Sequence, residues 1–215
     1  MIKRNINRYK RLARGLHAAR KHKKYIAPVV NTAVMAAKAY AMAKALKKST
    51  NIEYKIADIT DNASVSFSGY LAQLNNISQG ITDSTRVGDS CKIQNLVFRT
   101  LLARNGADAQ MRLILFWDKQ AKVTSSSDIL QNTGTIFSPL SPKNYDKRFQ
   151  TKILYDKVFN LNTDNPMRSL DLVIPINQHT QYNGATNLVN TGYLGVLFIS
   201  NINTANNPTM NYSIS

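Results

Sequence analysis

The stretch that decides the fold is SVSFSGYLAQL, residues 64–74. Its larger apolar residues Val65, Phe67 and Leu71 occupy odd-numbered positions, and the serines and Tyr70 occupy even-numbered positions. Because successive side chains of a strand point to opposite faces, this two-residue period predicts a half-buried β-strand rather than a helix. The rest of the fold prediction extends outward from this segment.

Similar strand-like runs lie on both sides of this segment. Seven are present, at residues 52–57, 91–103, 110–118, 149–161, 169–177, 192–200 and 209–214. Stretches rich in Asn, Gly, Asp and Pro separate them, which is the composition of turns. The longest helix-compatible run after residue 50 is only residues 126–131. We therefore predict an all-β fold, an eight-stranded antiparallel jelly-roll sandwich.

Charge divides the chain into two parts. The protein has 28 Lys and Arg against 12 Asp and Glu, a net charge of +16. Fourteen of the basic residues and none of the acidic ones fall within residues 1–48, so the remainder is nearly neutral. This asymmetry predicts a basic arm, residues 1–50, that binds a polyanion. Residues 51–215 are long enough for one hydrophobic core and form the single predicted domain.

Nucleic acid is the polyanion that suits the arm. Ten basic side chains near its start are the predicted phosphate contacts: Lys3, Arg4, Arg8, Lys10, Arg11, Arg14, Arg20, Lys21, Lys23 and Lys24. No zinc-finger, RNA-recognition or helix-turn-helix pattern accompanies them. We therefore expect contacts with phosphates rather than with bases, so that single-stranded DNA and RNA both remain open as partners.

The second half of the arm is predicted to form a helix at about residues 28–47. Pro28 suits the first helical position, and the Ala, Met, Lys and Leu residues that follow are good helix formers. One apolar stripe recurs at helical spacing and is a predicted subunit contact: Val30, Val34, Ala37 and Ala41. Asn and Lys residues interrupt the apolar run, so no membrane span is expected.

No catalytic site is predicted, and the protein is not expected to be an enzyme. His179 is the sole histidine after residue 50, and no nucleophile elbow, zinc motif or phosphate-binding loop is present. No organic cofactor is expected.

Oxygen-rich loops can bind calcium between subunits, and four carboxylates in or beside turns are the candidate ligands: Asp83, Asp89, Asp164 and Asp171. Asp118 and Asp156 are predicted to face solvent or a subunit contact.

Four segments occur in an order that is known from one family. They are NISQGITDSTRVGDSCKIQNLVFR (residues 76–99), MRLILFWD (111–118), KRFQTKILYDK (147–157) and YNGAT (182–186). In order and spacing they resemble the coat proteins of satellite tobacco necrosis virus and its relatives, and they are similar to capsid proteins of small circular single-stranded DNA viruses. The similarity covers about residues 74–200, with a basic arm in the equivalent place before it.

The resemblance implies a jelly roll that assembles into the smallest (T=1) icosahedral shell, about sixty identical copies around a small single-stranded genome. Arg86, in the first segment, is a further predicted subunit contact. The expected location is the virion and the host cytoplasm. The basic run at residues 20–24 also suits a nuclear localisation signal.

Two alternatives remain open. One is a cellular nucleic-acid-binding β-sandwich protein, and the other is a β-sandwich protein with a mitochondrial targeting arm, because a targeting arm is likewise basic and free of acids. The state of assembly distinguishes the three readings, since only a capsid protein forms a large closed shell.

Overall fold

The computed structural model describes residues 35, 37–42, 55–131, 137–203 and 205–215. The chain divides into two units, Met1–Tyr54 and Lys55–Ser215. In the first unit, residues 35 and 37–42 are helical and exposed to solvent. The rest of the helix predicted at residues 28–47, and all ten predicted phosphate contacts, lie outside the described residues. The second unit is called the body below.

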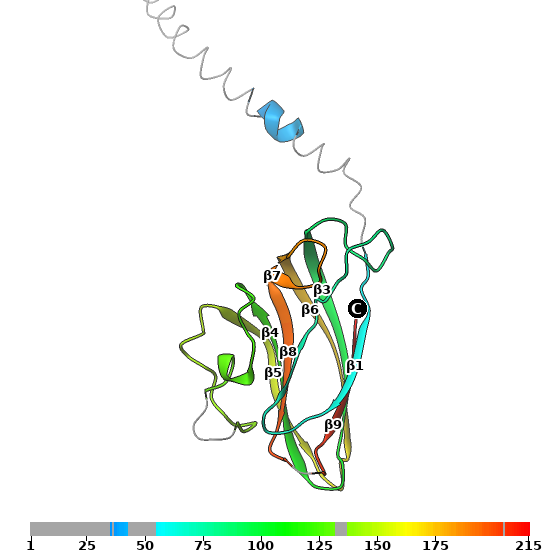
Figure 1. Ribbon diagram of the computed structural model, residues 1–215, viewed down its shortest axis with the longest axis vertical. Helices are drawn as coiled ribbons and strands as arrows, with labels where there is room; N and C mark the ends of the chain where they lie inside the picture. The colour runs from blue at the N-terminus through cyan, green and yellow to red at the C-terminus, as the bar shows by residue number, and fades with distance from the viewer. Residues whose placement is uncertain (1–34, 36, 43–54, 132–136, 204) are drawn as a thin grey trace, which may run out of the picture. The chain divides into compact units, whose positions relative to one another are not determined.

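The body is built of two antiparallel sheets packed face to face (Figure 1). Its strands are β1 (Ile59–Ser64), β2 (Tyr70–Gln73), β3 (Ser90–Ala103), β4 (Ala109–Asp118), β5 (Thr151–Leu161), β6 (Met167–Tyr182), β7 (Val189–Thr191), β8 (Tyr193–Ser200) and β9 (Thr209–Ile214). One short 3₁₀ helix, Ser126–Asp128, lies between β4 and β5.

The strand order identifies the architecture. One sheet runs β1-β9-β3-β6-β7 and the other β2-β8-β4-β5, so that the first and last strands pair with each other. Apart from β7, the chain contributes four strands to each sheet and crosses repeatedly from one sheet to the other, which is the jelly-roll topology. The predicted all-β jelly-roll sandwich is confirmed. The short β7 was not predicted; it extends the edge of one sheet beyond β6.

The main core lies between the two sheets. Large side chains such as Phe98 from β3, Leu113 from β4 and Tyr212 from β9 are almost completely buried there. Phe98 and Phe198 both stack on the ring of Tyr212, with ring centroids 5.8 and 6.1 Å apart. Burial of such aromatic side chains is the largest favourable contribution to the stability of a sandwich of this size.

A second core lies on the other face of the four-stranded sheet. Ile114 and Phe116 of β4 and Leu197 of β8 point away from the main core and pack against Ile129 and Leu130 of the long β4–β5 connection. Figure 1 shows this connection beside the four-stranded sheet. Consequently β4 is covered on both faces and shows no alternation of burial. A strand buried on both faces has the continuous apolar sequence seen in MRLILFWD.

The first two predicted strands were wrong in their boundaries. Residues 55–57 are not in a strand, and residues 52–54 lie outside the described part. The stretch at residues 64–74 is not one strand but the end of β1, a turn and then β2. Gly69 lies in this turn with φ of +80°, a conformation that favours glycine. Val65 packs in the main core whereas Leu71 packs in the second one. The two residues both occupy odd-numbered positions, but they do not lie on the same face of one strand.

Candidate interaction surfaces

Arg86 is the centre of one end of the body. Its side chain is only 1% exposed although it is charged. The guanidinium donates hydrogen bonds to backbone carbonyls on two separate loops, those of Ile77, Gly88, Gly184 and Thr186. It also lies over the ring of Tyr182, 4.2 Å from its centroid. A planar group with five donors is suited to joining several carbonyls at once. Arg86 therefore holds the β2–β3 loop against the β6–β7 loop.

A buried polar network supports these loops from below. The Asn75 side-chain amide donates to Thr180 Oγ1 at 3.0 Å and to the Gly192 carbonyl at 2.8 Å, and its oxygen accepts from the Leu194 N–H at 3.1 Å. Burial raises the pKa of the Tyr182 hydroxyl, which stays protonated and donates to the Asn75 carbonyl at 3.0 Å. Three of these bonds join Asn75 to β6 or β8, and the fourth joins it to Gly192 between β7 and β8, so that the loops have a fixed base.

The two loops present apolar side chains to solvent. Ile81, Val87 and Leu188 are 95%, 70% and 65% exposed. We call this surface the loop end, defined as residues 77–89 and 183–188. Asp83 and Asp89 are also exposed there, and Asp89 lies 3.6 Å from the buried guanidinium of Arg86. Large exposed apolar side chains on a rigid support are typical of contact surfaces between proteins.

The predicted subunit contact at Arg86 stays a prediction. Because its guanidinium is enclosed by its own subunit, any part that it plays in assembly has to act through the loops that it positions. Of the predicted apolar stripe, Ala37 and Ala41 are helical and exposed, while Val30 and Val34 lie outside the described residues. The subunit contact along this stripe is likewise still a prediction.

Asp118 was expected at a solvent or contact position, and this was wrong. Its residue exposure is 0%. The carboxylate accepts from the backbone N–H groups of Gln120, Lys122 and Val123, at 3.0, 2.6 and 2.8 Å. A carboxylate surrounded by N–H donors is stable in a buried place because each lone pair has a partner. Asp118 thus turns the chain at the end of β4 and starts the connection back over the sheet.

Asp156 also anchors this connection instead of facing solvent. Its two oxygens accept from Arg112 Nε and Nη2, at 2.7 and 2.9 Å, and Lys143 lies 3.1 Å away. Arg112 donates in addition to the carbonyls of Pro139 and Ser141. Burial raises the pKa of Asp156, but the hydrogen bonds and positive charges of Arg112 and Lys143 outweigh it, and the net shift is downward.

The connection carries an exposed group of aromatic residues. Tyr145 and Phe149 are 68% and 75% exposed, and Arg148 lies between them, with its guanidinium carbon 3.8 and 4.4 Å from the two ring centroids. A turn fixes the group, because the Arg148 N–H and its Nη1 both donate to the Tyr145 carbonyl. We call Tyr145, Arg148 and Phe149 the aromatic platform. Tyr, Phe and Arg are enriched at protein interfaces.

The four predicted calcium ligands are distributed over the body. Asp83 and Asp89 lie at the loop end, Asp164 lies in the β5–β6 turn, and Asp171 lies on β6, where it pairs with Arg99 at 3.3 Å. Over the residues that the structure describes, no three His, Cys, Asp or Glu side chains are grouped so that they could hold a metal. A calcium site made by residues of several subunits stays a prediction.

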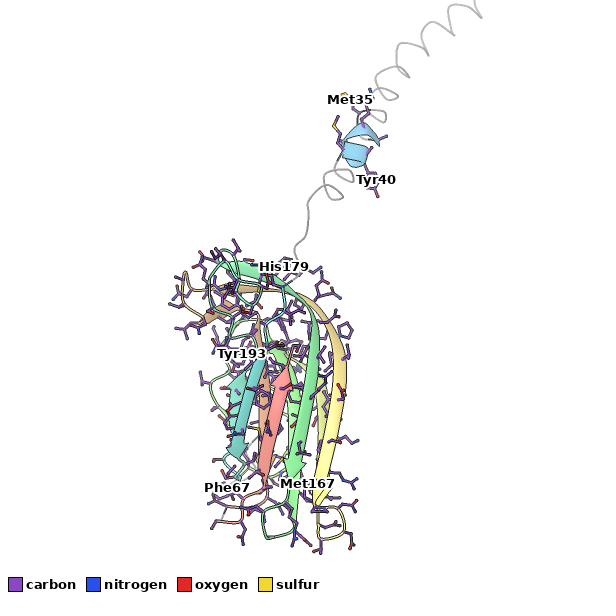
Figure 2. The ribbon with its side chains drawn as sticks, turned by 90° about the vertical axis from the view of Figure 1, so that its right-hand side faces the viewer. Met35, Tyr40, Phe67, Met167, His179 and Tyr193 are labelled. Carbon is purple, nitrogen blue, oxygen red and sulfur yellow. The ribbon has the colours of Figure 1, made fainter. Side chains whose placement is uncertain are left out.

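His179 and the turns of the opposite end lie far apart on the body. Figure 2 labels His179 near the end that carries the β6–β7 loop, and Phe67 and Met167 near the other end. His179 is exposed on β6. The opposite end is formed by the β1–β2, β3–β4, β5–β6 and β8–β9 turns, and the last two of these are rich in Asn. Within the described ranges, no helix is both long and apolar enough to cross a membrane.

Comparison with known proteins gives the following findings. No family model matches the chain, and no curated protein matches it. Among solved structures, that of broad bean stain virus aligns with 73% of this chain and 85% of its own, at 13% identity and a TM-score of 0.34. That of desmodium yellow mottle tymovirus aligns with 73% and 82%, at 11% identity and a TM-score of 0.28.

The Israel acute paralysis virus pentamer aligns with 75% of this chain and 84% of its own, at 9% identity and a TM-score of 0.28. Scores this low carry no argument about function. The jelly-roll assignment rests on the order in which this chain's own strands pair.

Proposed function

We propose that this protein is a viral coat protein of the satellite tobacco necrosis virus type, with a structural rather than a catalytic role. Its body assembles into a small T=1-like shell of about sixty copies, and its arm packages a single-stranded genome. The observation that carries the proposal is the separation of charge on a jelly-roll chain. Residues 1–48 hold fourteen basic and no acidic residues, whereas the remainder has fourteen basic and twelve acidic residues.

The amount of charge fits a small genome. Sixty arms with fourteen positive charges each supply roughly 840 charges, which would neutralise a genome of about a thousand nucleotides. A protein that works alone on nucleic acid gains nothing from a large body without charge bias. A shell subunit needs such a body, because closed shells require many contacts between neutral surfaces while the genome is bound elsewhere on the chain.

The surfaces of the body also support the proposal. Both the loop end and the aromatic platform expose large apolar side chains on rigidly held turns. Exposed apolar side chains that gather on one surface mark contact sites between proteins, whereas single scattered ones are common on any soluble protein. The ten predicted phosphate contacts, the location in a virion and a nuclear step in the host belong to this proposal.

The test is assembly of the full-length recombinant protein. We would follow size-exclusion chromatography, negative-stain microscopy and the 260/280 nm absorbance ratio of the peak. The proposal expects uniform shells about 200 Å across, a diameter suited to some sixty small jelly rolls, with nucleic acid that resists nuclease. A variant in which the ten basic residues from Lys3 to Lys24 are replaced by glutamine should lose the nucleic acid.

Two results would contradict the proposal. A wild-type protein that binds nucleic acid but stays monomeric across salt and calcium concentrations would favour the cellular nucleic-acid-binding alternative. Removal of the first few dozen residues after import into mitochondria, without particles, would favour the mitochondrial alternative.

A further inference from the structure

The loop end and the aromatic platform differ in charge as well as in position. At the loop end, Asp83 and Asp89 are exposed. Asp89 lies 3.6 Å from Arg86, and Lys55 Nζ donates to the Thr82 carbonyl at 2.9 Å, so that among the described residues Asp83 is the loop-end carboxylate without an ion pair. Over residues 143–152, which contain the platform, Lys143 and Lys147 lie near the carboxylates of Asp156 and Asp128, at 3.1 and 3.9 Å. The other charged residues of this stretch are Arg148, Lys152 and Asp146, a surplus of one positive charge. Both surfaces are apolar at their centres. They are therefore complementary to each other and not to themselves.

We propose that the aromatic platform of one copy docks on the loop end of a second copy of this chain. The inference rests on the proposed function, because it names one contact of the proposed shell. Tyr145 and Phe149 would cover Ile81, Val87 and Leu188, and Arg148 would lie near Asp83. Such a contact buries apolar side chains from both copies and pairs charges at its rim.

The charges favour a head-to-tail contact, in which the platform of one copy meets the loop end of another. If two platforms met each other, the guanidinium groups of both Arg148 side chains would lie close together, and Asp146 would be the one exposed carboxylate that each stretch of residues 143–152 offers against them. If two loop ends met, Asp83 and Asp89 of both copies would repel. Contact between a platform and a loop end avoids both of these repulsions. A head-to-tail contact repeats from copy to copy and gives a ring where the rotation closes, or an open filament where it does not, whereas a like-with-like contact stops at a dimer.

Both surfaces are held before they meet. The loop end is fixed by Arg86 and by the network at Asn75, and the platform is fixed by stacking and by the turn at Tyr145. Little side-chain entropy is then lost when the copies associate, and more of the apolar burial appears as affinity. Asp83 makes no ion pair within the described residues, so that its charge is available to a neighbour.

The other partner that an Arg–aromatic group suits is a single-stranded nucleic acid, because bases stack on exposed rings. The second copy is favoured because the same body also carries a matching apolar surface with the opposite charge. A contact with nucleic acid would leave the exposed side chains of Ile81, Val87 and Leu188 without a role.

A charge exchange tests the contact in the full-length protein. The variants are Arg148→Glu, Asp83→Lys and the two combined, with Arg168→Glu, an exposed position on β6, as the matched control. Thermal unfolding is compared first to show that all four fold. The protein concentration needed for assembly is then measured by light scattering and microscopy, and association below shell size by sedimentation velocity.

We expect each single variant to raise the concentration needed for assembly about tenfold or more, as charge reversal does at interfaces. The combined variant should recover most of this loss, and Arg168→Glu should match the wild type. Single variants that assemble normally would overturn the inference while leaving the proposed function standing. The same holds if both single variants fail and the combination does not recover.

Further outcomes would distinguish the contact between copies from a nucleic-acid site, and would show whether the proposed function or only the closed shell is wrong. Normal assembly of Arg148→Glu together with weaker binding of a thymidine oligonucleotide would replace the proposed contact by a nucleic-acid site. A wild-type protein that stays monomeric at every concentration would overturn the proposed function and the contact together. The wild type could form only small rings, which the single variants lose and the combined variant recovers. In that case the proposed contact would stand and only the closed shell would be overturned.

Discussion

Replacement of Arg86 by methionine tests whether this buried charge holds the loops together. The change keeps most of the side-chain volume but removes all donors to the four carbonyls and the contact with Tyr182. A hydrogen bond to a charged group contributes about 1.5–3 kcal/mol. Gly88, Gly184 and Thr186 are exposed, so water can replace the guanidinium at their carbonyls. We therefore expect a total loss of about 3 kcal/mol, less than the sum over the four bonds.

That loss corresponds to a decrease in Tm of about 6–12 °C for a domain of this size. The assay is thermal unfolding followed by circular dichroism, in a buffer in which light scattering shows separate subunits. Arg86→Lys should lie between the wild type and Arg86→Met, because an ammonium group keeps the charge but offers fewer donors. Arg168→Met, at an exposed position, should change the stability by less than about 0.5 kcal/mol. A Tm of Arg86→Met within 2 °C of the wild type would refute the reasoning.

Two further predictions concern the body. The pKa of Asp156 is lowered in the folded state, so this carboxylate contributes stability above its unfolded pKa, about 3.9, and the contribution is lost as the pH falls through the folded value. Asp156→Asn should therefore be less stable than the wild type at pH 7, and urea titrations should show a smaller difference at pH 3; an equal difference at both would contradict this. Gly192→Ala should lower Tm by several degrees, because its φ is +76° and the added Cβ would overlap the His179 carbonyl oxygen and the Trp117 ring. Gly88→Ala has the same backbone strain but open space, so a larger effect there than at Gly192 would count against the argument.

Most strands could be predicted because their sequence pattern is local. The runs predicted at residues 91–103 and 110–118 match β3 and β4 within one residue at each end. The first strands were misplaced because alternation continued through the turn at Gly69, and the pattern of apolar residues alone cannot show that a chain changes sheets. The end of β6 was predicted too early, at residue 177, whereas the strand continues to Tyr182. It passes through Asn177, whose φ is +52°, and through a register shift against β3, neither of which the apolar pattern shows.

The contacts of the candidate surfaces could be predicted less well. The sequence marks Arg86 as a charged residue between turn formers, but nothing local indicates that two of its four carbonyl partners, Gly184 and Thr186, lie about a hundred positions further along the chain. Asp118 was misread for a different reason. Its donors follow directly in the sequence, and a polar residue at the end of a continuous apolar strand was a usable signal of a buried turn. Exposure of Tyr145 and Phe149 cannot be inferred from their apolar character.

The pairing of β1 with β9 has a consequence for the order in which this chain folds. Ile59 is opposite Ile214, so the edge of one sheet is completed by residues about 150 positions apart. A ribosome adds about 5–20 residues per second, which leaves roughly 8 to 30 s between the synthesis of the two strands. Long-range pairing of this kind also slows folding itself. The basic arm is thus made well before the body can close, and a nascent chain can meet nucleic acid before it can meet a second copy.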